Sequence, residues 1–313
     1  MLIRKKKMRA IKTAIIVLLL SLGTILNASA QPLRTVAFAQ DTMANDFRRA
    51  QVFEVRDALA AHPELTFVYS DAKGQTSLLI RQIEQFIAAE VNLLIVGTNH
   101  ADAVVPVVTK AHRMGIPVII LDRGINSLEY TTFINSDNIR IGAMGADYVA
   151  KRLNGRGNVL LFEGLQEADV TQLRSRGFLD EIAKYKDIKV IRRTGNYLRK
   201  DAIIETEKLI KAGVRIDAIF SESDSMLSGV RSVLHRYKID PASIITAGCD
   251  YTSEAREAIL KGEQSASILF PLGGKASVDV ALKILAKEKV PKHISIPVKL
   301  ITMDNAERVE PIF

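Results

Sequence analysis

The stretch Gly115-Ile-Pro-Val-Ile-Ile-Leu-Asp-Arg123 decides the fold class, because a run of apolar residues ends directly on an acidic and a basic side chain. A short continuous apolar run is typical of a strand that is buried on both faces of a parallel sheet. In open α/β sheets, ligands bind in the crevice outside the carboxyl ends of the strands. We therefore expect Asp122 and Arg123 to lie in a cleft, where together they clamp neighbouring hydroxyl groups. The alternative is a surface ion pair that closes a loop.

Short β-rich runs alternate with amphipathic segments on both sides of this strand, which is the pattern of a parallel sheet with crossover helices. Apolar stripes at helical spacing, such as Leu79, Ile83 and Ile87, predict core packing and carry no chemistry. The polar residues 135–138 predict a helix cap and a crossing between two lobes. Strands are expected at 34–39, 65–70, 92–97, 117–121, 130–134, 157–162, 187–192, 216–220, 243–248 and 264–269.

The arrangement of these segments predicts two lobes. No long linker or low-complexity tract separates the two halves, so several short crossings fit the pattern better than two independent domains on a string. We expect a first lobe formed by 31–135 plus 271–290, and a second lobe formed by 136–270 plus 291–313.

Residues 1–30 have the features of a secretory signal peptide. Six basic residues precede the apolar run 14–22, and the small residues Ala28-Ser29-Ala30 follow it. This predicts export, with cleavage after Ala30 and a mature protein that begins at Gln31. A membrane anchor needs roughly 20 predominantly apolar residues, more than this run supplies, although an uncleaved anchor is the alternative.

Without this leader the charge is nearly balanced. The whole chain has 43 Lys and Arg against 35 Asp and Glu, and removal of the six basic residues of the leader leaves 37 against 35. This balance offers no support for binding to nucleic acid or to an anionic membrane. The single cysteine, Cys249, cannot form an intramolecular disulfide, and we expect it to pack as a small buried hydrophobe.

Motifs of catalysis are absent from the sequence. It has no Gly-x-Ser-x-Gly elbow, and the run 273–277 lacks the first glycine of a phosphate loop because Leu269 stands in its place. The pair Gly155 and Gly157 precedes a strand instead of following one, so dinucleotide binding is unsupported. The five histidines are scattered without metal-ligand spacing. We therefore expect no enzyme activity, no cofactor and no metal.

Several short motifs follow one another in a fixed order along the chain. They are Leu121-Asp122-Arg123, Ser136-Asp137-Asn138, Arg174-x-x-Gly177-Phe178, Phe220 to Asp224 with Met226, and Gly248-x-Asp250. Together they resemble the periplasmic sugar-binding proteins of the ribose and galactofuranose type. The likeness extends from Leu33 to Lys299 and implies two Rossmann-like α/β lobes, with parallel sheets flanked by helices, which three crossings join. It also implies a periplasmic protein that closes over one monosaccharide and delivers it to an ABC-type permease.

This resemblance assigns roles to several residues near strand ends. Asp122 and Arg123 match the family's paired sugar clamp. Arg174 matches the arginine that reaches the sugar from the second lobe. Asp250 matches the carboxylate that follows the strand ending at Gly248.

The first βα loop contains further candidates, namely Asp41, Phe47 and Arg48. It resembles the loop where galactofuranose-type members place an aromatic residue beside an arginine. By that likeness Phe47 packs on a sugar face and Arg48 donates to hydroxyl groups. The alternative is a helix amino terminus in which Asn45 or Asp46 is the cap and Phe47 enters the core.

Two departures from the ribose type bear on the ligand. Ser223 stands where those proteins carry an asparagine, so an amide is replaced by a hydroxyl that makes fewer hydrogen bonds. Phe270 stands near the place of their glutamine, where an aromatic ring would stack on an apolar sugar face. We therefore expect a sugar other than ribose.

The candidate residues include three arginines and three aspartates, and this balance favours a neutral monosaccharide over a charged one. The leading hypothesis is a transport receptor. The alternative is a sugar-sensing subunit that docks on a membrane histidine kinase or chemoreceptor, and it requires the same cleft. An exported enzyme lacks a visible nucleophile. A sugar-responsive repressor would need a DNA-binding headpiece, and the leader stands in its place.

Overall fold

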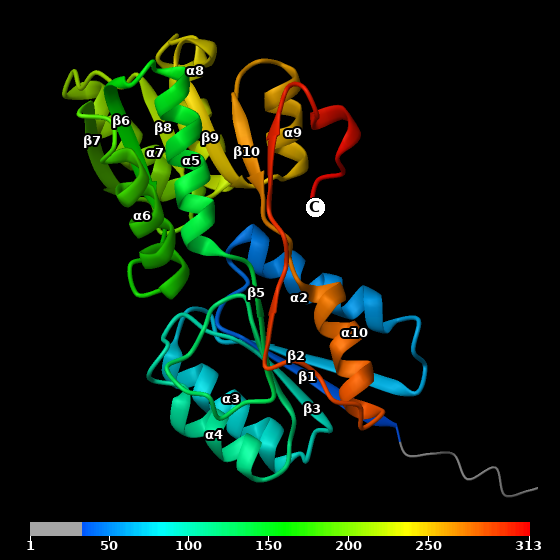
Figure 1. Cartoon of the computed structure of the whole chain (residues 1–313). Helices are drawn as coiled ribbons and strands as arrows, with labels where there is room; N and C mark the ends of the chain where they lie inside the picture. The colour runs from blue at the N-terminus through cyan, green and yellow to red at the C-terminus, as the bar shows by residue number, and fades with distance from the viewer. Residues whose placement is uncertain (1–32) are drawn as a thin grey trace, which may run out of the picture. The chain divides into compact units, whose positions relative to one another are not determined.

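The computed structural model describes residues 33–313 (Figure 1). The predicted leader and its cleavage site after Ala30 lie outside these residues. From Arg34 onward the chain forms two six-stranded sheets with helices on their faces. Within 33–313, none of the helices combines the length and the apolar character that a bilayer crossing requires.

The first sheet has the strand order β11-β5-β4-β3-β1-β2. Its strands are β1 (Arg34–Gln40), β2 (Leu65–Asp71), β3 (Leu93–Gly97), β4 (Val118–Leu121), β5 (Thr132–Asn135) and β11 (His293–Ser295). Helices α3 (Thr76–Ala88) and α4 (Val105–Arg113) pack on one face of it. Helices α2 (Asp46–Leu59) and α10 (Gly274–Leu285) pack on the other face.

The second sheet has the order β12-β10-β9-β8-β6-β7. Among the described strand pairs of this sheet, β12 and β10 are antiparallel and the others are parallel. Its strands are β6 (Arg156–Glu163), β7 (Asp187–Thr194), β8 (Ala218–Ser221), β9 (Ile245–Asp250), β10 (Ala266–Leu269) and β12 (Lys299–Thr302). Helices α5 (Asn138–Arg152) and α6 (Asp169–Ile182) contribute to the core on one face. Helices α7 (Arg199–Lys211) and α8 (Asp224–Arg236) contribute to the core on the other.

The chain passes between the sheets three times: after β5, after β10, and between β11 and β12. The predicted fold class, two α/β lobes that three crossings join, is therefore confirmed. The predicted lobe boundaries differ from the strand pairing in one place. We assigned 291–313 to the second lobe, but β11 pairs with β5 in the first sheet, because Ile294 lies beside Ile134 in register.

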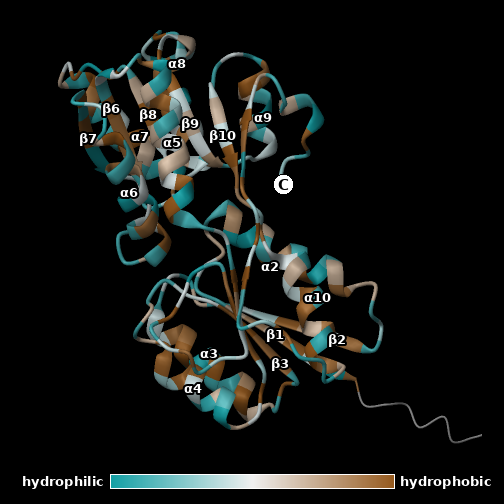
Figure 2. Ribbon diagram, viewed as in Figure 1, coloured by the Kyte–Doolittle hydropathy of each residue, from teal (hydrophilic) through white to brown (hydrophobic). Residues whose placement is uncertain are grey.

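Burial explains why these segments form strands. Every residue of β3 and β4 is buried, as expected for central parallel strands with helices on both faces. Figure 2 shows β3 as a hydrophobic segment, whereas the helices on the outside also carry hydrophilic residues. Cys249 is fully buried in the core of the second lobe, which confirms its predicted packing role.

The helix amino termini carry the predicted caps. The side chain of Asp137 accepts a hydrogen bond from the backbone N–H of Arg140 and caps α5. The side chain of Asn45 accepts from the backbone N–H of Arg48 and caps α2. Both caps lie where the chain approaches the carboxyl ends of strands, so they fix the direction of helices that border the site.

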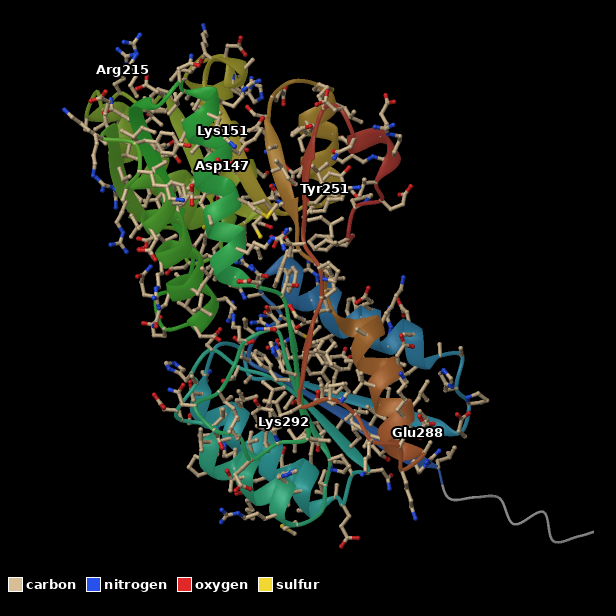
Figure 3. All side chains as sticks on the ribbon, in the orientation of Figure 1. Asp147, Lys151, Arg215, Tyr251, Glu288 and Lys292 are labelled. Carbon is tan, nitrogen blue, oxygen red and sulfur yellow. The ribbon has the colours of Figure 1, made fainter. Side chains whose placement is uncertain are left out.

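The last residues of the chain pack on the second lobe, where the 3-10 helix η2 (Ala306–Arg308) contacts α9 (Ser253–Leu260), while a second 3-10 helix, η1 (Pro241–Ser243), precedes β9 and contacts α8. Tyr251 is labelled in Figure 3, and its hydroxyl donates to the carbonyl oxygen of Ala306 at 2.8 Å. The labelled pair Asp147 and Lys151 lies on an exposed face of α5 at i,i+4 spacing. An exposed pair of this kind contributes little to stability.

Candidate functional site

Residues from both lobes line one narrow cavity of about 20 Å³, so the side chains described below fill most of the space between the lobes. Every site residue predicted from the sequence lines it except Asp41, which contacts two of the lining residues. The lining residues are Asn45, Phe47, Arg48, Asp122, Arg123, Val170, Arg174, Tyr197, Ser223, Asp250 and Phe270.

The charged residues of the first lobe form crossed pairs. Arg48 Nη1 lies 2.9 Å from Asp122 Oδ2, and Arg123 Nη1 lies 3.4 Å from Asp41 Oδ2. All four side chains are at most 8% exposed, so this is not a surface ion pair that closes a loop. Asp122 is paired with Arg48 on α2, and Arg123 with Asp41 in the loop before α2, so this loop and helix are held against the end of β4.

Four polar atoms of this group have no hydrogen-bond partner among the described residues: Asp41 Oδ1, Arg48 Nη2, Asp122 Oδ1 and Arg123 Nε. Each such atom costs about 1–3 kcal/mol when it is buried and unpaired. Two of them accept and two donate. A ligand that both donates hydrogen bonds to the two carboxylate oxygens and accepts them from the two guanidinium N–H groups would remove this cost.

The backbone is strained at the two cavity aspartates. Asp122 has a φ of 70° and Asp250 a φ of 112°, a region that side chains other than glycine rarely adopt. Asp122 follows β4 in the first lobe, and Asp250 is the last residue of β9 in the second. Such strain costs of order 1–3 kcal/mol, and it is typical of functional sites.

Arg174 reaches the cavity from α6 and is 3% exposed. Its Nε donates to Asn138 Oδ1 at 2.8 Å, and its Nη1 donates to the carbonyl oxygen of Glu222 at 2.8 Å. These two bonds orient the guanidinium and leave further N–H groups for other partners. The guanidinium also lies 4.5 Å from the ring centroid of Phe270.

The apolar wall of the cavity is formed by Phe47 and Phe270. Their rings stack at 5.1 Å between centroids with an interplanar angle of 20°. Phe47 is 7% exposed and belongs to the same core cluster as Phe270. Its ring therefore both packs in the core, as in the alternative interpretation of the sequence, and lines the cavity.

Two residues of the second lobe complete the predicted set. Ser223 is the N-cap of α8, and its Oγ accepts from the N–H of Met226 at 3.2 Å, so its hydroxyl proton is free to be donated elsewhere. Burial raises the pKa of Asp250 well above its ordinary value, while the positive charge of Arg174 acts in the opposite direction. A hydrogen bond from a ligand hydroxyl would stabilise the buried carboxyl group of Asp250.

Asn45, Val170 and Tyr197 line the cavity but were not predicted as site residues. Asn45 was considered only as a helix cap. Tyr197 follows β7, and the rule that ligands lie at strand ends would have found it had it been applied to that edge strand. Val170 has an apolar side chain, and nothing in the sequence distinguishes it from a core residue.

Several contacts cross the cleft. Asn45 Nδ2 donates to the carbonyl oxygen of Tyr197 at 2.8 Å, and the N–H of Gly124 donates to Asp169 Oδ2 at 2.8 Å. Asp46 approaches the second lobe through Arg199, whose Nη2 lies 3.7 Å from Asp46 Oδ2. The two lobes therefore touch at points around the cavity.

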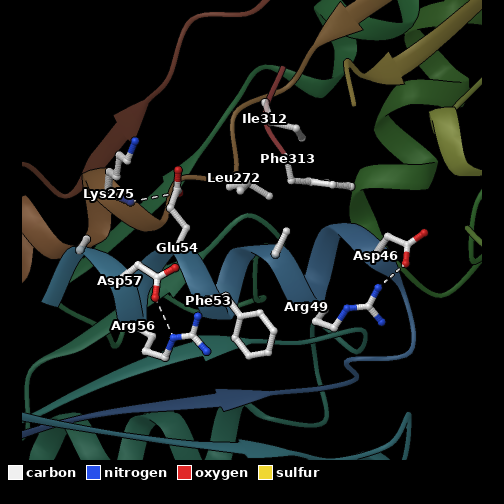
Figure 4. Close-up of a pocket in the computed structure, with 12 residues that line it drawn as sticks. Asp46, Arg49, Phe53, Glu54, Arg56, Asp57, Leu272, Lys275, Ile312 and Phe313 are labelled. Carbon is white, nitrogen blue, oxygen red and sulfur yellow. Dashed lines mark hydrogen bonds and ion pairs between the residues drawn. The ribbon is translucent and has the colours of Figure 1, made fainter. Parts of the chain in front are cut away.

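A second pocket, about 660 Å³ in volume, lies on α2 and is lined also by Leu272, Lys275 and the last two residues of the chain (Figure 4). Four of its charged side chains form ion pairs, Arg49 with Asp46 and Arg56 with Asp57. It is more open than the cavity between the lobes and lacks the unpaired buried atoms found there. No cluster of metal-ligating side chains occurs within residues 33–313.

The profile of the family described as periplasmic binding protein domain matches residues 36–289. The chain belongs to this family. This periplasmic binding protein is 28% identical over 302 residues to the ribose import binding protein of Haemophilus influenzae, covering 95% of this chain and 99% of that protein. It is 29% identical over 283 residues to the galactofuranose-binding protein of Escherichia coli, covering 87% and 86%.

Among solved structures, this periplasmic binding protein is similar to the fructose binding periplasmic domain of a hybrid two-component system. The TM-score is 0.82 at 27% identity, covering 88% of this chain and 92% of that chain. The family resemblance inferred from the sequence is thus confirmed. These relatives are binding proteins, which confirms the prediction that the chain is not an enzyme. The family also agrees with the predicted periplasmic location.

Proposed function

We propose that this protein is a periplasmic receptor that closes over one neutral monosaccharide and delivers it to an ABC-type permease. The proposed contacts are Asp41, Arg48, Asp122 and Arg123 from the first lobe, with Phe47 as an apolar wall. The second lobe and the crossings contribute Arg174, Ser223, Asp250 and Phe270. We also propose that export removes residues 1–30, which the amino-terminal sequence of the exported protein would test.

The observation that carries this proposal is the set of two donors and two acceptors left unpaired in the buried cavity, at Arg48, Arg123, Asp41 and Asp122. A sugar hydroxyl donates to a carboxylate and accepts from a guanidinium at once, so one polyol serves both kinds of atom. The relatives named for ribose, galactofuranose and fructose are named for neutral sugars, which supports the same ligand class.

We expect a neutral monosaccharide to raise the melting temperature in a panel of ribose, galactose, fructose and arabinose with their phosphates, because a ligand that binds only the folded state stabilises it. The affinity for the best sugar should change by no more than roughly twofold between about 0.01 M and about 1 M salt, because no net charge is exchanged. Calorimetry at the two salt concentrations measures this. Preference for a sugar phosphate would refute the neutral ligand.

Closure should accompany binding. Because each lobe supplies part of the proposed site, the contacts to a sugar are complete only when the lobes meet, and binding shifts the population toward that state. We expect the radius of gyration from solution scattering to decrease when the best sugar of the panel is added to saturation. A sugar that binds without any compaction would contradict the two-lobed clamp, and a panel sugar that does not bind serves as the control.

A second candidate function is sugar sensing, in which the closed protein docks on a membrane histidine kinase or chemoreceptor. The similarity to a periplasmic domain of a hybrid two-component system favours considering it. Both functions use the same cleft. Genes for a permease and an ATPase beside this gene would support transport, and genes for a kinase and a regulator would support sensing.

A further inference from the structure

Two carboxyl groups lie behind the cleft wall of the second lobe and share one hydroxyl. Glu163, the last residue of β6, is 4% exposed, and Glu222, which follows β8, is fully buried. Ser175 Oγ lies 2.7 Å from Glu163 Oε1 and 2.8 Å from Glu222 Oε1. A serine hydroxyl has one proton and donates to only one of them, so the second contact needs a proton from the other side.

The surroundings decide which carboxyl group holds that proton. Arg192 binds both oxygens of Glu163, with Nη2 to Oε1 at 2.6 Å and Nε to Oε2 at 3.2 Å, so Glu163 is ionised. The hydrogen-bond partners of the Glu222 carboxyl group among the described residues are neutral. Ser175 then donates to Glu163 and accepts from a protonated Glu222. In agreement, burial raises the pKa of Glu222 to about 7, while the N–H of Gly164 and the charge of Arg174 oppose the rise.

The groups that face Glu222 come from every element packed around it. They are Glu163 on β6, Arg174 and Ser175 on α6, Arg192 on β7, Tyr197 in the loop after β7, and Cys249 on β9. Only Arg174 and Arg192 among these are cations. Arg192 is committed to Glu163, and Arg174 bonds the backbone oxygen of Glu222, not its carboxyl group.

Tyr197 joins this group to the cleft. Its hydroxyl lies 2.7 Å from Thr171 Oγ1 and 3.4 Å from Glu222 Oε2. A Cβ on Gly164 would lie 1.9 Å from the Tyr197 ring, so the ring is packed against that backbone. On its other side, Tyr197 meets the first lobe through the hydrogen bond from Asn45 and through Arg123, whose Cζ lies 5.4 Å from the ring centroid.

We propose that Tyr197 is a positioning residue of the cleft and that the proton held between Glu222 and Ser175 keeps it in place. This inference rests on the proposed function, since it concerns closure over a ligand. Loss of the proton leaves two carboxylates around one hydroxyl. Their repulsion moves Glu222 away from Ser175, releases the Tyr197 hydroxyl, and weakens the contacts of Tyr197 with Asn45 and Arg123.

The sign of the pH dependence follows from linkage. Glu222 has a raised pKa in the folded protein, so the stability linked to its proton is fully present below the ordinary carboxyl pKa and is lost as the pH rises through about 7. Closure brings the first lobe against Tyr197 and excludes water behind it. The closed form therefore binds the proton more tightly than an open one, and ligand binding weakens as the pH rises.

Glu222→Gln tests the proposal, because the amide has the shape of the protonated acid and donates to Ser175 while accepting from Gly164. The matched control is Glu257→Gln, an exposed glutamate on α9 of the same lobe. The signals of Tyr197 in ¹³C-tyrosine-labelled protein, assigned through Tyr197→Phe, are followed from about pH 5.5 to about pH 8.5, a range centred near the pKa of Glu222. We expect them to titrate near pH 7 in the wild type and in the control, and to stay constant in Glu222→Gln.

Calorimetry with every panel sugar that binds gives the second readout. The dissociation constant should rise as the pH approaches 7 from below in the wild type, by at most about tenfold per pH unit, the limit for one linked proton, and level off above pH 7, whereas it should stay constant in Glu222→Gln. The proposal is wrong if the Tyr197 signals do not titrate, or if they titrate equally in Glu222→Gln. It is also wrong if these signals titrate but the dissociation constant does not change with pH. If no panel sugar binds but Tyr197 titrates with Glu222, the proposed ligand class fails and the positioning role stands.

Discussion

Sugar binding is expected to weaken by more than tenfold when Arg123 is replaced by alanine. Arg123 is 7% exposed, and its Nε has no hydrogen-bond partner among the described residues. Truncation of one partner of a buried, hydrogen-bonded charge pair costs roughly 2–5 kcal/mol. Each 1.4 kcal/mol is a tenfold change in affinity. Calorimetry with the best sugar of the panel measures the loss.

The structure changes the reason for this expectation. From the sequence we expected the substitution to leave Asp122 without its cation, but Asp122 is paired with Arg48, and Arg123 is paired with Asp41. In the variant, Arg48 Nε, 3.8 Å away, is the cation that remains beside Asp41 among residues 33–313. Because Asp122 keeps its partner, we expect the unliganded protein to fold.

Two further variants make this test specific. Arg123→Lys keeps the positive charge but loses the planar fork of donors, so its affinity should lie between those of the wild type and Arg123→Ala. Arg113→Ala removes an arginine of the same lobe that is 70% exposed, and it should bind as the wild type does. Wild-type affinity in Arg123→Ala would remove this residue from the site, and a failure to fold would favour a structural role.

The largest loss of folding stability is expected for Gly177→Ala. A Cβ at this position would lie 2.0 Å from the carbonyl oxygen of Ile139 on α5, and a Cβ on Gly142 would lie 1.9 Å from the carbonyl oxygen of Arg174. The two helices thus cross with their backbones in contact. Rotation of a side chain cannot relieve a clash with backbone atoms, so α5 and α6 must move apart.

Two opposing effects set the size of this loss. Alanine favours a helix over glycine by about 1 kcal/mol. Overpacking of a close contact costs typically 1–3 kcal/mol and occasionally more, and because both clashing atoms here belong to rigid helices we expect the upper end. The net loss in the free energy of unfolding should be about 2 kcal/mol or more, measured by urea denaturation. Displacement of α6 should also weaken sugar binding, because Arg174 lies on this helix.

Arg176→Ala is the matched control for this variant, since its side chain is 71% exposed and lies next to Gly177 on the same helix. We expect its stability to stay within about 0.5 kcal/mol of the wild type. A Gly177→Ala protein as stable as this control would show that the two helices do not cross as closely as described.

Much of the site was predictable because it lies at strand ends. A buried apolar run that ends on Asp122 and Arg123 marks the carboxyl edge of a sheet, and the same reasoning leads to Asp250 after β9. Local pattern also predicted a cap within the polar residues 135–138 and offered Asn45 or Asp46 as a cap of α2, because a polar residue before an apolar helical stripe satisfies free backbone N–H groups, and the structure uses Asp137 and Asn45.

Contacts between distant segments were not predictable. Asp122 and Arg123 are neighbours in the chain, but Asp122 binds Arg48 on α2 and Arg123 binds Asp41 in the loop before it. Tyr197 follows the edge strand β7, which does not end on a charged pair that would mark a site. The strand β11 has only three residues, and its pairing with β5 depends on the path of the crossings between the lobes.

The sequence by itself determined the alternation of strands and helices, the family and the residues that stand at the strand ends, because burial periodicity and short motifs are local properties of the chain. Only the tertiary structure decided which charges pair, which polar atoms stay unpaired in the cavity, and how Glu222 and Ser175 come to support Tyr197. The reason is physical: hydrogen bonds and desolvation depend on distances of a few ångströms between segments far apart in the sequence, and these distances are set by the packing of the whole fold.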